Sequence, residues 1–210
     1  ETLSNLLEVN LNFNEVGDKG AVSLTKPSHL KKLKRIELAY NRLDRAGNEA
    51  LQKFRILQDI KELNAAGRLN EIGDLIQGDL GVTALLQFPH IANLEVLDLS
   101  ESSLTDRSVI AIANSDKLSG LLALNLSGNR ITDMGAGALA ESGHLAQLKK
   151  LDLNFNSIGD AGAQAIAESP HLANIESLKL GQNRVGMAGA KALKESSTLI
   201  NLMHPIFGFY

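Results

Sequence analysis

The chain of 210 residues contains no cysteine. It therefore has no disulfide bond, no thiolate metal site and no cysteine nucleophile, which suits a reducing cytosol. Lysine and arginine number 21 against 24 acidic residues, so the formal net charge is −3 and the pI is about 6.0. This balance lacks the basic surface that nucleic acids and anionic membranes attract, and we expect no nucleic-acid partner.

Long apolar runs are also missing from the sequence. No stretch approaches the roughly 18 apolar residues that cross a bilayer, and no basic segment followed by an apolar one opens the chain. We therefore expect no membrane insertion. Residues 1–5 match the close of a repeat unit, with Leu3 in the place of Leu172, so we expect further repeat sequence upstream.

What the chain has in abundance is repetition. A leucine or isoleucine recurs with one constant spacing in two series, which are Leu6, Leu33 and Ile60, and then Leu94, Leu121, Leu148, Ile175 and Leu202. The step from Ile60 to Leu94 is longer than the others, so the unit at residues 60–93 is irregular and carries seven extra residues. Self-similarity at such a period indicates a solenoid.

Each unit has two halves with different periodicity. The front half reads L-x-x-L-x-L-x-x-N-x-[IVL], and its alternation predicts a short strand that buries one face. One instance is Leu148, Leu151, Leu153, Asn156 and Ile158. The back half, DAGAQAIAES in one unit, has helical spacing that places Ala163, Ile166 and Ala167 on one face.

Two positions at the start of each helix recur. Aspartate opens the helix in five units, where it can accept a backbone N–H as an N-cap: Asp18, Asp79, Asp106, Asp133 and Asp160. Met187 takes this position in the last full unit, so we expect that helix to fray. Glycine occupies the first helical turn in six units: Gly20, Gly47, Gly81, Gly135, Gly162 and Gly189. Because glycine there costs roughly 1 kcal/mol relative to alanine, we expect a close approach between helix and neighbouring loop.

Other recurring polar residues fit a scaffold. An asparagine ends the strand in five units, and its amide both donates and accepts, which predicts a ladder between successive turns: Asn14, Asn41, Asn129, Asn156 and Asn183. Ser102 and Arg68 replace it in two units. Four histidines share one repeat position and point in parallel, so they do not converge on a metal: His29, His90, His144 and His171. No spacing suggests a catalytic set, so we expect no catalytic residues, no metal and no cofactor.

These features resemble the leucine-rich repeat family. The 27-residue period with a true helix is similar to the ribonuclease-inhibitor type, and units such as GDAGAQAIAES look most like bacterial repeat proteins, including secreted effectors. The resemblance implies an α/β fold, a curved solenoid of about seven repeats with a parallel sheet on the concave face and helices on the convex face. We expect residues 1–210 to form a single domain, with residues 202–210 as a degenerate C-terminal cap.

Spacing explains the expected curvature. Strands stack about 4.8 Å apart, whereas packed helices need roughly 8–10 Å, so the sheet lies on the inner side of the bend. Seven strands then give a hollow about 29 Å long.

Side chains that alternate with the core leucines should face this hollow, and they vary while the scaffold positions do not. The candidate partner-binding residues on the concave face and its rim are Asn10, Asn12, Phe13, Glu37, Tyr40, Asn64, Asp98, Glu101, Asn125, Asp152, Asn154, Phe155, Lys179 and Gln182. Three of them belong to a small set of six phenylalanines and two tyrosines. Aromatic residues in a polar field are typical interface hot spots, although these rings could instead pack on neighbouring loop atoms. The mildly acidic centre favours a partner with basic or amide groups.

The sequence thus predicts a monomeric, non-enzymatic protein–protein interaction module. The resemblance favours a virulence effector that acts on a host protein, located in the cytoplasm or secreted into a host cell cytosol. Three alternatives remain open: a GTPase-regulating repeat protein like the Ran GTPase-activating family, the recognition domain of a larger enzyme whose catalytic part lies outside this chain, and a structural spacer. The irregular unit is either a recognition protrusion or a tolerated insertion.

Overall fold

The structure is a computed structural model of the chain. It describes residues 5–17, 19–20, 23, 30, 32–33, 35–37, 41, 61–64, 78–87 and 91–203. The expectations for Asp18, His29, Tyr40, Gly47, Arg68, His90 and most of the C-terminal cap lie outside these residues.

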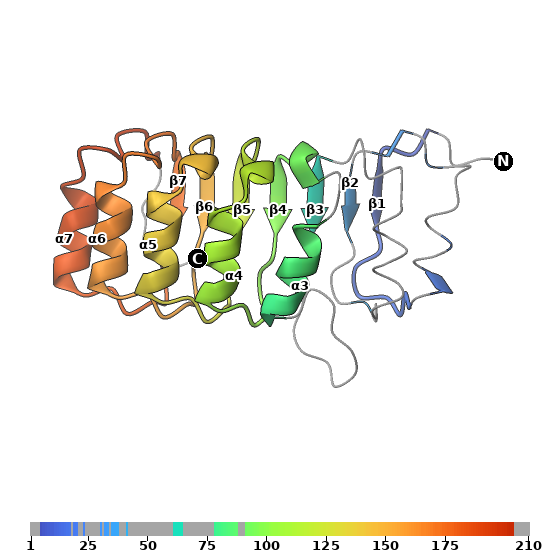
Figure 1. Cartoon of the computed structure of the whole chain (residues 1–210), viewed down its shortest axis with the longest axis horizontal. Helices are drawn as coiled ribbons and strands as arrows, with labels where there is room; N and C mark the ends of the chain where they lie inside the picture. The colour runs from blue at the N-terminus through green and yellow to red at the C-terminus, as the bar shows by residue number, and fades with distance from the viewer. Residues whose placement is uncertain are drawn as a thin grey trace.

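The described part of the chain contains a seven-stranded parallel sheet in which the strands follow chain order (Figure 1). Its strands are β1 (Glu8–Asn10), β2 (Arg35–Glu37), β3 (Glu62–Asn64), β4 (Val96–Asp98), β5 (Ala123–Asn125), β6 (Lys150–Asp152) and β7 (Ser177–Lys179). The register pairs Leu63 with Leu97, and Leu97 with Leu124. The seven extra residues of the irregular unit therefore leave the strand register intact.

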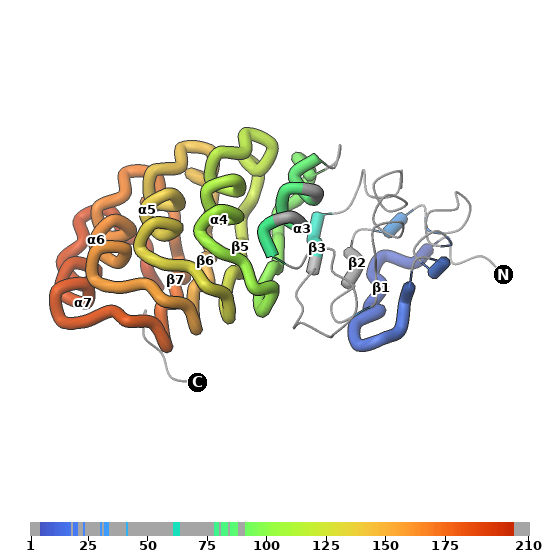
Figure 2. The backbone as a smooth tube through the Cα atoms, turned by 60° about the horizontal axis from the view of Figure 1, so that its bottom comes forward, coloured from blue at the N-terminus to red at the C-terminus, as the bar shows by residue number. Residues whose placement is uncertain are grey.

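Helices cover one face of this sheet (Figures 1 and 2). The described α-helices are α3 (Gly78–Leu85), α4 (Asp106–Ala113), α5 (Asp133–Glu141), α6 (Asp160–Glu168) and α7 (Met187–Lys194), and short 3₁₀ helices are η2 (Ile91–Asn93), η3 (Asp116–Leu118) and η4 (Gly143–Leu145). Each helix packs on the next one along the chain. The predicted solenoid, with a parallel sheet on one face and helices on the other, is confirmed.

The core lies between the sheet and the helices. Leu151 and Leu153 are at most 1% exposed, and Ala163, Ile166 and Ala167 on α6 are at most 2% exposed. The predicted strand and helix faces are therefore the buried ones. Small alanines on the helices allow neighbouring helices to approach while the leucines fill the interior.

The predicted asparagine ladder forms at Asn41, Asn129, Asn156 and Asn183, whereas the Asn14 amide donates to the carbonyl of Asn12 in its own unit. The Asn129 amide donates to the carbonyl of Leu99 in the preceding unit (3.0 Å) and to that of Leu126 in its own unit (2.9 Å). Its oxygen accepts the backbone N–H of Leu104 at 2.9 Å. Asn41, Asn156 and Asn183 make the equivalent bonds to their preceding units. These amides satisfy buried backbone groups for which the turn leaves no ladder partner.

The aspartate prediction was wrong about which helix is capped. Asp106 is the first residue of α4, and the N-cap of α4 is Thr105. The Asp106 carboxylate instead accepts the backbone N–H groups of Thr132 (2.8 Å) and Gly135 (3.0 Å), in the first turn of α5. The first N–H groups of a helix have no partner within it, and for α5 this carboxylate of the preceding unit accepts two of them.

The same pattern removes the reason to expect fraying of the last described helix. Asp160 accepts the N–H groups of Gly186 (2.7 Å) and Gly189 (2.8 Å), so α7 is capped from the preceding unit although it begins with Met187. The methionine at the start of α7 therefore does not remove the cap of α7 itself.

The recurring glycines are explained by the same carboxylates. A Cβ atom at Gly162 would lie 2.7 Å from Asp133 Oδ1 and 3.0 Å from the Cβ atom of Ala136. The predicted close approach is therefore confirmed, but the neighbour is the preceding helix and its aspartate, not a loop. Where serine takes this position, the Ser108 hydroxyl donates to Asp79.

Hydrogen bonds set the ionisation of Asp79. Partial burial raises the pKa of its carboxyl group, but bonds from Ser108 and Thr105 outweigh that effect and hold the pKa below its ordinary value. The carboxylate is therefore the form that these donors stabilise.

A serine ladder was not predicted. Ser142 donates to the carbonyl of Ala113, and Ser169 donates to that of Ala140, each at the C-terminal end of the preceding helix. Ser196 does the same to Ala167. These three serines recur with the repeat period, which is the signal that could have identified them.

We predict that replacing Asp133 with alanine lowers the free energy of unfolding by about 1–2 kcal/mol. Gly159, the N-cap of α6, has no side chain, so the Asp133 carboxylate is the side-chain cap of that helix. Hydrogen exchange should show lost protection in the first turn of α6, not of α5. Glu141→Ala removes the same charge at an exposed site and should change neither quantity; equal effects of the two substitutions would contradict capping between units.

Candidate functional site

The residues predicted to face the hollow form a continuous row across the sheet. The strand register aligns Asn10, Glu37, Asn64, Asp98, Asn125, Asp152 and Lys179. We call the part of this row with described side chains on β4–β7 the Asx row: Asp98, Asn125, Asp152 and Lys179. Residues that occupy the same position in successive repeats thus lie next to one another on adjacent strands.

The Asx row has a scaffold role that the sequence analysis missed. Oδ1 of Asp98 accepts the backbone N–H of Ser100 (2.9 Å), and Oδ1 of Asp152 accepts that of Asn154 (3.0 Å). Asn125 makes the same bond two residues ahead. Such bonds turn the chain out of the strand, so one oxygen of each side chain is occupied.

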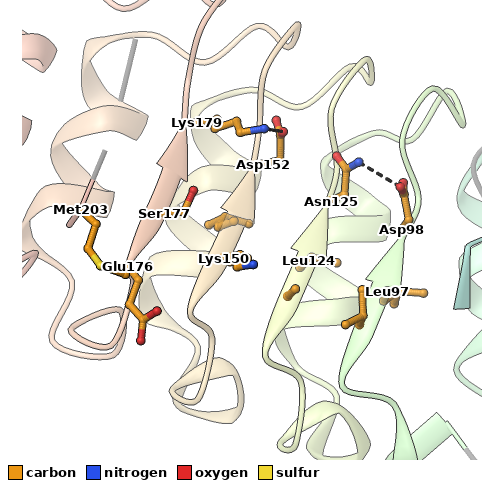
Figure 3. Close-up of a pocket in the computed structure, with 13 residues that line it drawn as sticks. Leu97, Asp98, Leu124, Asn125, Lys150, Asp152, Glu176, Ser177, Lys179 and Met203 are labelled. Atoms are coloured by element: carbon orange, nitrogen blue, oxygen red, sulfur yellow. Dashed lines mark hydrogen bonds and ion pairs between the residues drawn. The ribbon is translucent and has the colours of Figure 1, made fainter. Parts of the chain in front are cut away.

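The remaining polar atoms of the Asx row pair with one another. The Asn125 amide donates to Asp98 Oδ2 at 3.1 Å, and the Lys179 ammonium lies 3.0 Å from Asp152 Oδ2 (Figure 3). Asp98 and Asp152, two of the acidic residues expected to attract a basic partner, therefore already have partners. Asn154 is also engaged, because its Oδ1 accepts the N–H of Gly181 at 2.7 Å.

The predicted rim residues share an uncommon backbone conformation. Phe13, Glu101, Phe155 and Gln182 have φ values of 54–56°, and Gly128 has φ 67° at the same repeat position. This left-handed region is costly for a bulky side chain. Phe13 is 76% exposed and Phe155 is 62% exposed. Burial of these rings therefore stabilises the fold little and does not offset the cost of the backbone conformation.

We predict that Phe155→Gly raises the free energy of unfolding by about 0.5–1 kcal/mol, because relief of left-handed strain exceeds the entropy cost of glycine. Urea denaturation followed by circular dichroism measures the change. Phe155→Ala keeps the Cβ atom and the strain, and it should bring no gain. A loss of stability in the glycine variant would show that the ring supports the fold.

A second row faces the hollow and was missing from the sequence prediction. We call it the middle row: Val96, Ala123, Lys150 and Ser177, which the register aligns on β4–β7. Period-two alternation places Lys150 on the same face as Asp152, so the signal was present in the sequence. The middle row and the Asx row line a hollow of about 580 Å³ (Figure 3).

A third row lies at the start of the strands, and two of its members, Glu176 and Met203, line the hollow. We call it the lower row, and its members occupy one repeat position: Glu95, Leu122, Lys149, Glu176 and Met203. Lys149 pairs with Glu176 at 3.2 Å. The backbone N–H groups of Lys149 and Lys150 both donate to the carbonyl of Leu122 (2.8 and 3.1 Å), which fixes where the strand begins.

The described residues contain no group of three or more His, Cys, Asp or Glu side chains placed to hold a metal ion. His144 is exposed and His171 is half-buried. Across the same described ranges, no helix has the length and apolar character needed to span a bilayer. The candidate site is therefore the Asx row and the middle row, with Glu176 and Met203 beside them and the predicted rim residues.

Comparison with known proteins identifies the family. A model described as leucine-rich repeat matches residues 2–24, 90–113, 120–140, 144–167 and 171–194, together more than half of the chain. The chain therefore belongs to the leucine-rich repeat family. A search of curated proteins finds no match.

Solved structures share the fold. Internalin InlF of Listeria monocytogenes is 21% identical with a TM-score of 0.61, and the match covers 99% of this chain and 49% of InlF. Internalin C2 of the same organism is 24% identical with a TM-score of 0.55, covering 96% and 71%. TLR13 in its complex with ssRNA13 is 24% identical with a TM-score of 0.50, covering 87% and 26%. The chain thus spans about half the length of InlF.

At these identities the likeness establishes the solenoid fold alone, and it includes bacterial leucine-rich repeat proteins. Leucine-rich repeat domains are typically protein–protein interaction modules, because their stacked units present an extended concave surface.

Proposed function

We propose that this chain is a non-enzymatic module that binds a protein partner on its hollow face and rim. The observation that carries the proposal is Phe155, a 62% exposed ring in the left-handed conformation beside the hollow. A bulky exposed residue that costs the fold stability is explained by contact with a partner. Exposed aromatic anchors of this kind carry much of the energy of protein interfaces.

The size of the face supports the same proposal. Seven strands about 4.8 Å apart give a surface about 29 Å long, enough with its loops for the roughly 800 Å² that one partner contributes to a standard interface. Hydrogen bonds between units hold this surface in place before binding, which lowers the entropy lost on association.

The finer proposal concerns the biological setting. Repeats similar to those of bacterial effectors, and a fold shared with internalins of Listeria monocytogenes, support a bacterial protein that acts as a monomer on a host protein. We propose the ribonuclease-inhibitor-like type, a single domain over residues 1–210, and action in the cytoplasm or in a host cell cytosol. Residues 60–93 form its irregular unit and residues 202–210 its C-terminal cap.

Site-specific photo-cross-linking tests where the partner binds. Phe155 is replaced with p-benzoylphenylalanine in one variant, and the exposed Gln164 on α6 is replaced in the control. After irradiation in a mammalian cell lysate, we expect discrete cross-linked proteins from position 155 and none from position 164. Cross-links from position 164 alone would place the interface on the helices, and the absence of any would contradict a host protein partner.

Nucleic acid is the competing ligand class, since TLR13 is seen with ssRNA13. We predict that this chain, with a net charge of −3, does not bind single-stranded RNA tightly at physiological salt. Fluorescence anisotropy with a labelled random-sequence RNA measures this. Sub-micromolar binding that weakens steeply with added salt would overturn the protein-partner proposal.

A further inference from the structure

The charged side chains of the two rows on either side of the middle row have hydrogen-bond or ion-pair partners. In the Asx row, Asn125 donates to Asp98 and Lys179 pairs with Asp152. In the lower row, Lys149 pairs with Glu176. Charged groups that already have partners attract a ligand weakly, because they must first be separated from those partners.

The middle row differs from both neighbours. Lys150 is exposed and Ser177 is half-buried, and neither side chain makes a hydrogen bond or an ion pair with any residue that the structure describes. The register places them side by side on β6 and β7 (Figure 3). Together they offer an ammonium group and a hydroxyl group to an anion entering the hollow.

The other half of the middle row is small and apolar. Val96 and Ala123 are half-buried neighbours on β4 and β5, and they line the same hollow as Lys150. We call the part of the hollow over the middle row the trough. It runs across the strands, with an apolar binding position over Val96 and Ala123 at one end and a cationic binding position over Lys150 and Ser177 at the other.

The distance between these two binding positions matches the side-chain repeat of an extended peptide. The midpoint between β4 and β5 lies one and a half strand spacings from β6, which is about 7 Å. Side chains on one side of an extended segment recur every two residues, or about 6.7 Å. In a peptide with an aliphatic and an acidic side chain two positions apart, the first could therefore contact Val96 and Ala123 while the second contacts Lys150.

We infer that the middle row binds an extended segment of the protein partner, with an Asp or Glu carboxylate on Lys150 and Ser177 and an aliphatic side chain, two residues away, on Val96 and Ala123. This inference rests on the proposed function, and it specifies the two side chains by which the partner is recognised. It differs from the sequence expectation of a basic partner, because Asp98 and Asp152 are paired, whereas Lys150 has no partner among the described residues.

Peptide display tests the inference directly. A random nine-residue library is selected on the immobilised full chain, and we expect enrichment of sequences in which an acidic and an aliphatic residue are separated by one position. An enriched peptide is then synthesised with a fluorescent label, and its affinity is measured by anisotropy. Failure of the library to yield any binder, or yield of binders without this pair, overturns the inference.

Charge reversal locates the acidic contact. Lys150→Glu should weaken the peptide by about ten-fold or more, the loss expected for a hydrogen-bonded charge contact. Changing the peptide's acidic residue to lysine should restore binding to this variant. Lys191→Glu, the same change at an exposed site on α7, should leave the affinity unchanged.

Filling the trough locates the aliphatic contact. Ala123→Leu should weaken the peptide without changing the charge, whereas Ala161→Leu at an exposed site on α6 should not. Circular dichroism checks that each variant keeps its fold. Binding that is lost with Ala123→Leu but is indifferent to Lys150→Glu overturns the acidic contact and leaves the proposed function standing. Binding lost only with the two helix-face variants overturns both.

Discussion

The carboxylate of Asp133 accepts the backbone N–H groups of Gly159 and Gly162, in the next unit of the solenoid. The amide of Asn156 and the hydroxyl of Ser169 reach in the opposite direction, to carbonyls of Leu126 and Ala140 in the preceding unit. Each unit thus leaves backbone groups open at its helix ends and at its strand end, and a neighbour satisfies them. Because a buried polar group without a partner is costly, no unit is stable alone, and the stack is the unit of folding.

This exchange of hydrogen bonds separates scaffold from surface within each repeat. The aspartate, asparagine, serine and glycine that mediate it recur in most units; at Gly162, for example, a Cβ atom would lie 2.7 Å from the Asp133 carboxylate. Side chains that face the hollow make fewer of these hydrogen bonds between units, and they differ from unit to unit. Even there the division is incomplete, since Asp98 and Asp152 each use one oxygen to turn the chain at the end of the strand.

The proposed partner contacts are side chains that take no part in the described hydrogen bonds between units. On the rim, Phe155 is exposed and strained. In the hollow, the charged side chains of the Asx row and the lower row have partners on adjacent strands. Lys150 has none among the residues that the structure describes, and it lies beside Ala123. Charged and apolar side chains therefore lie close together on this surface, although the net charge of the chain is only −3. In the proposed complex, specificity comes from which groups lack partners, and the overall charge of the protein has little part in it.

The sequence by itself determined the repeat, the two halves of each unit and the buried leucines, because the repeat period and the periods of strand and helix are properties of the chain alone. It also determined the asparagine ladder and the row from Asn10 to Lys179, since a fixed repeat length places equivalent residues in register. Only the tertiary structure decided that Asp106 caps α5 and not its own helix, because that depends on the distance between neighbouring units. It likewise decided that Asp152 is neutralised by Lys179 while Lys150 is not, since a sequence shows which charges exist and only their positions in space show which of them meet.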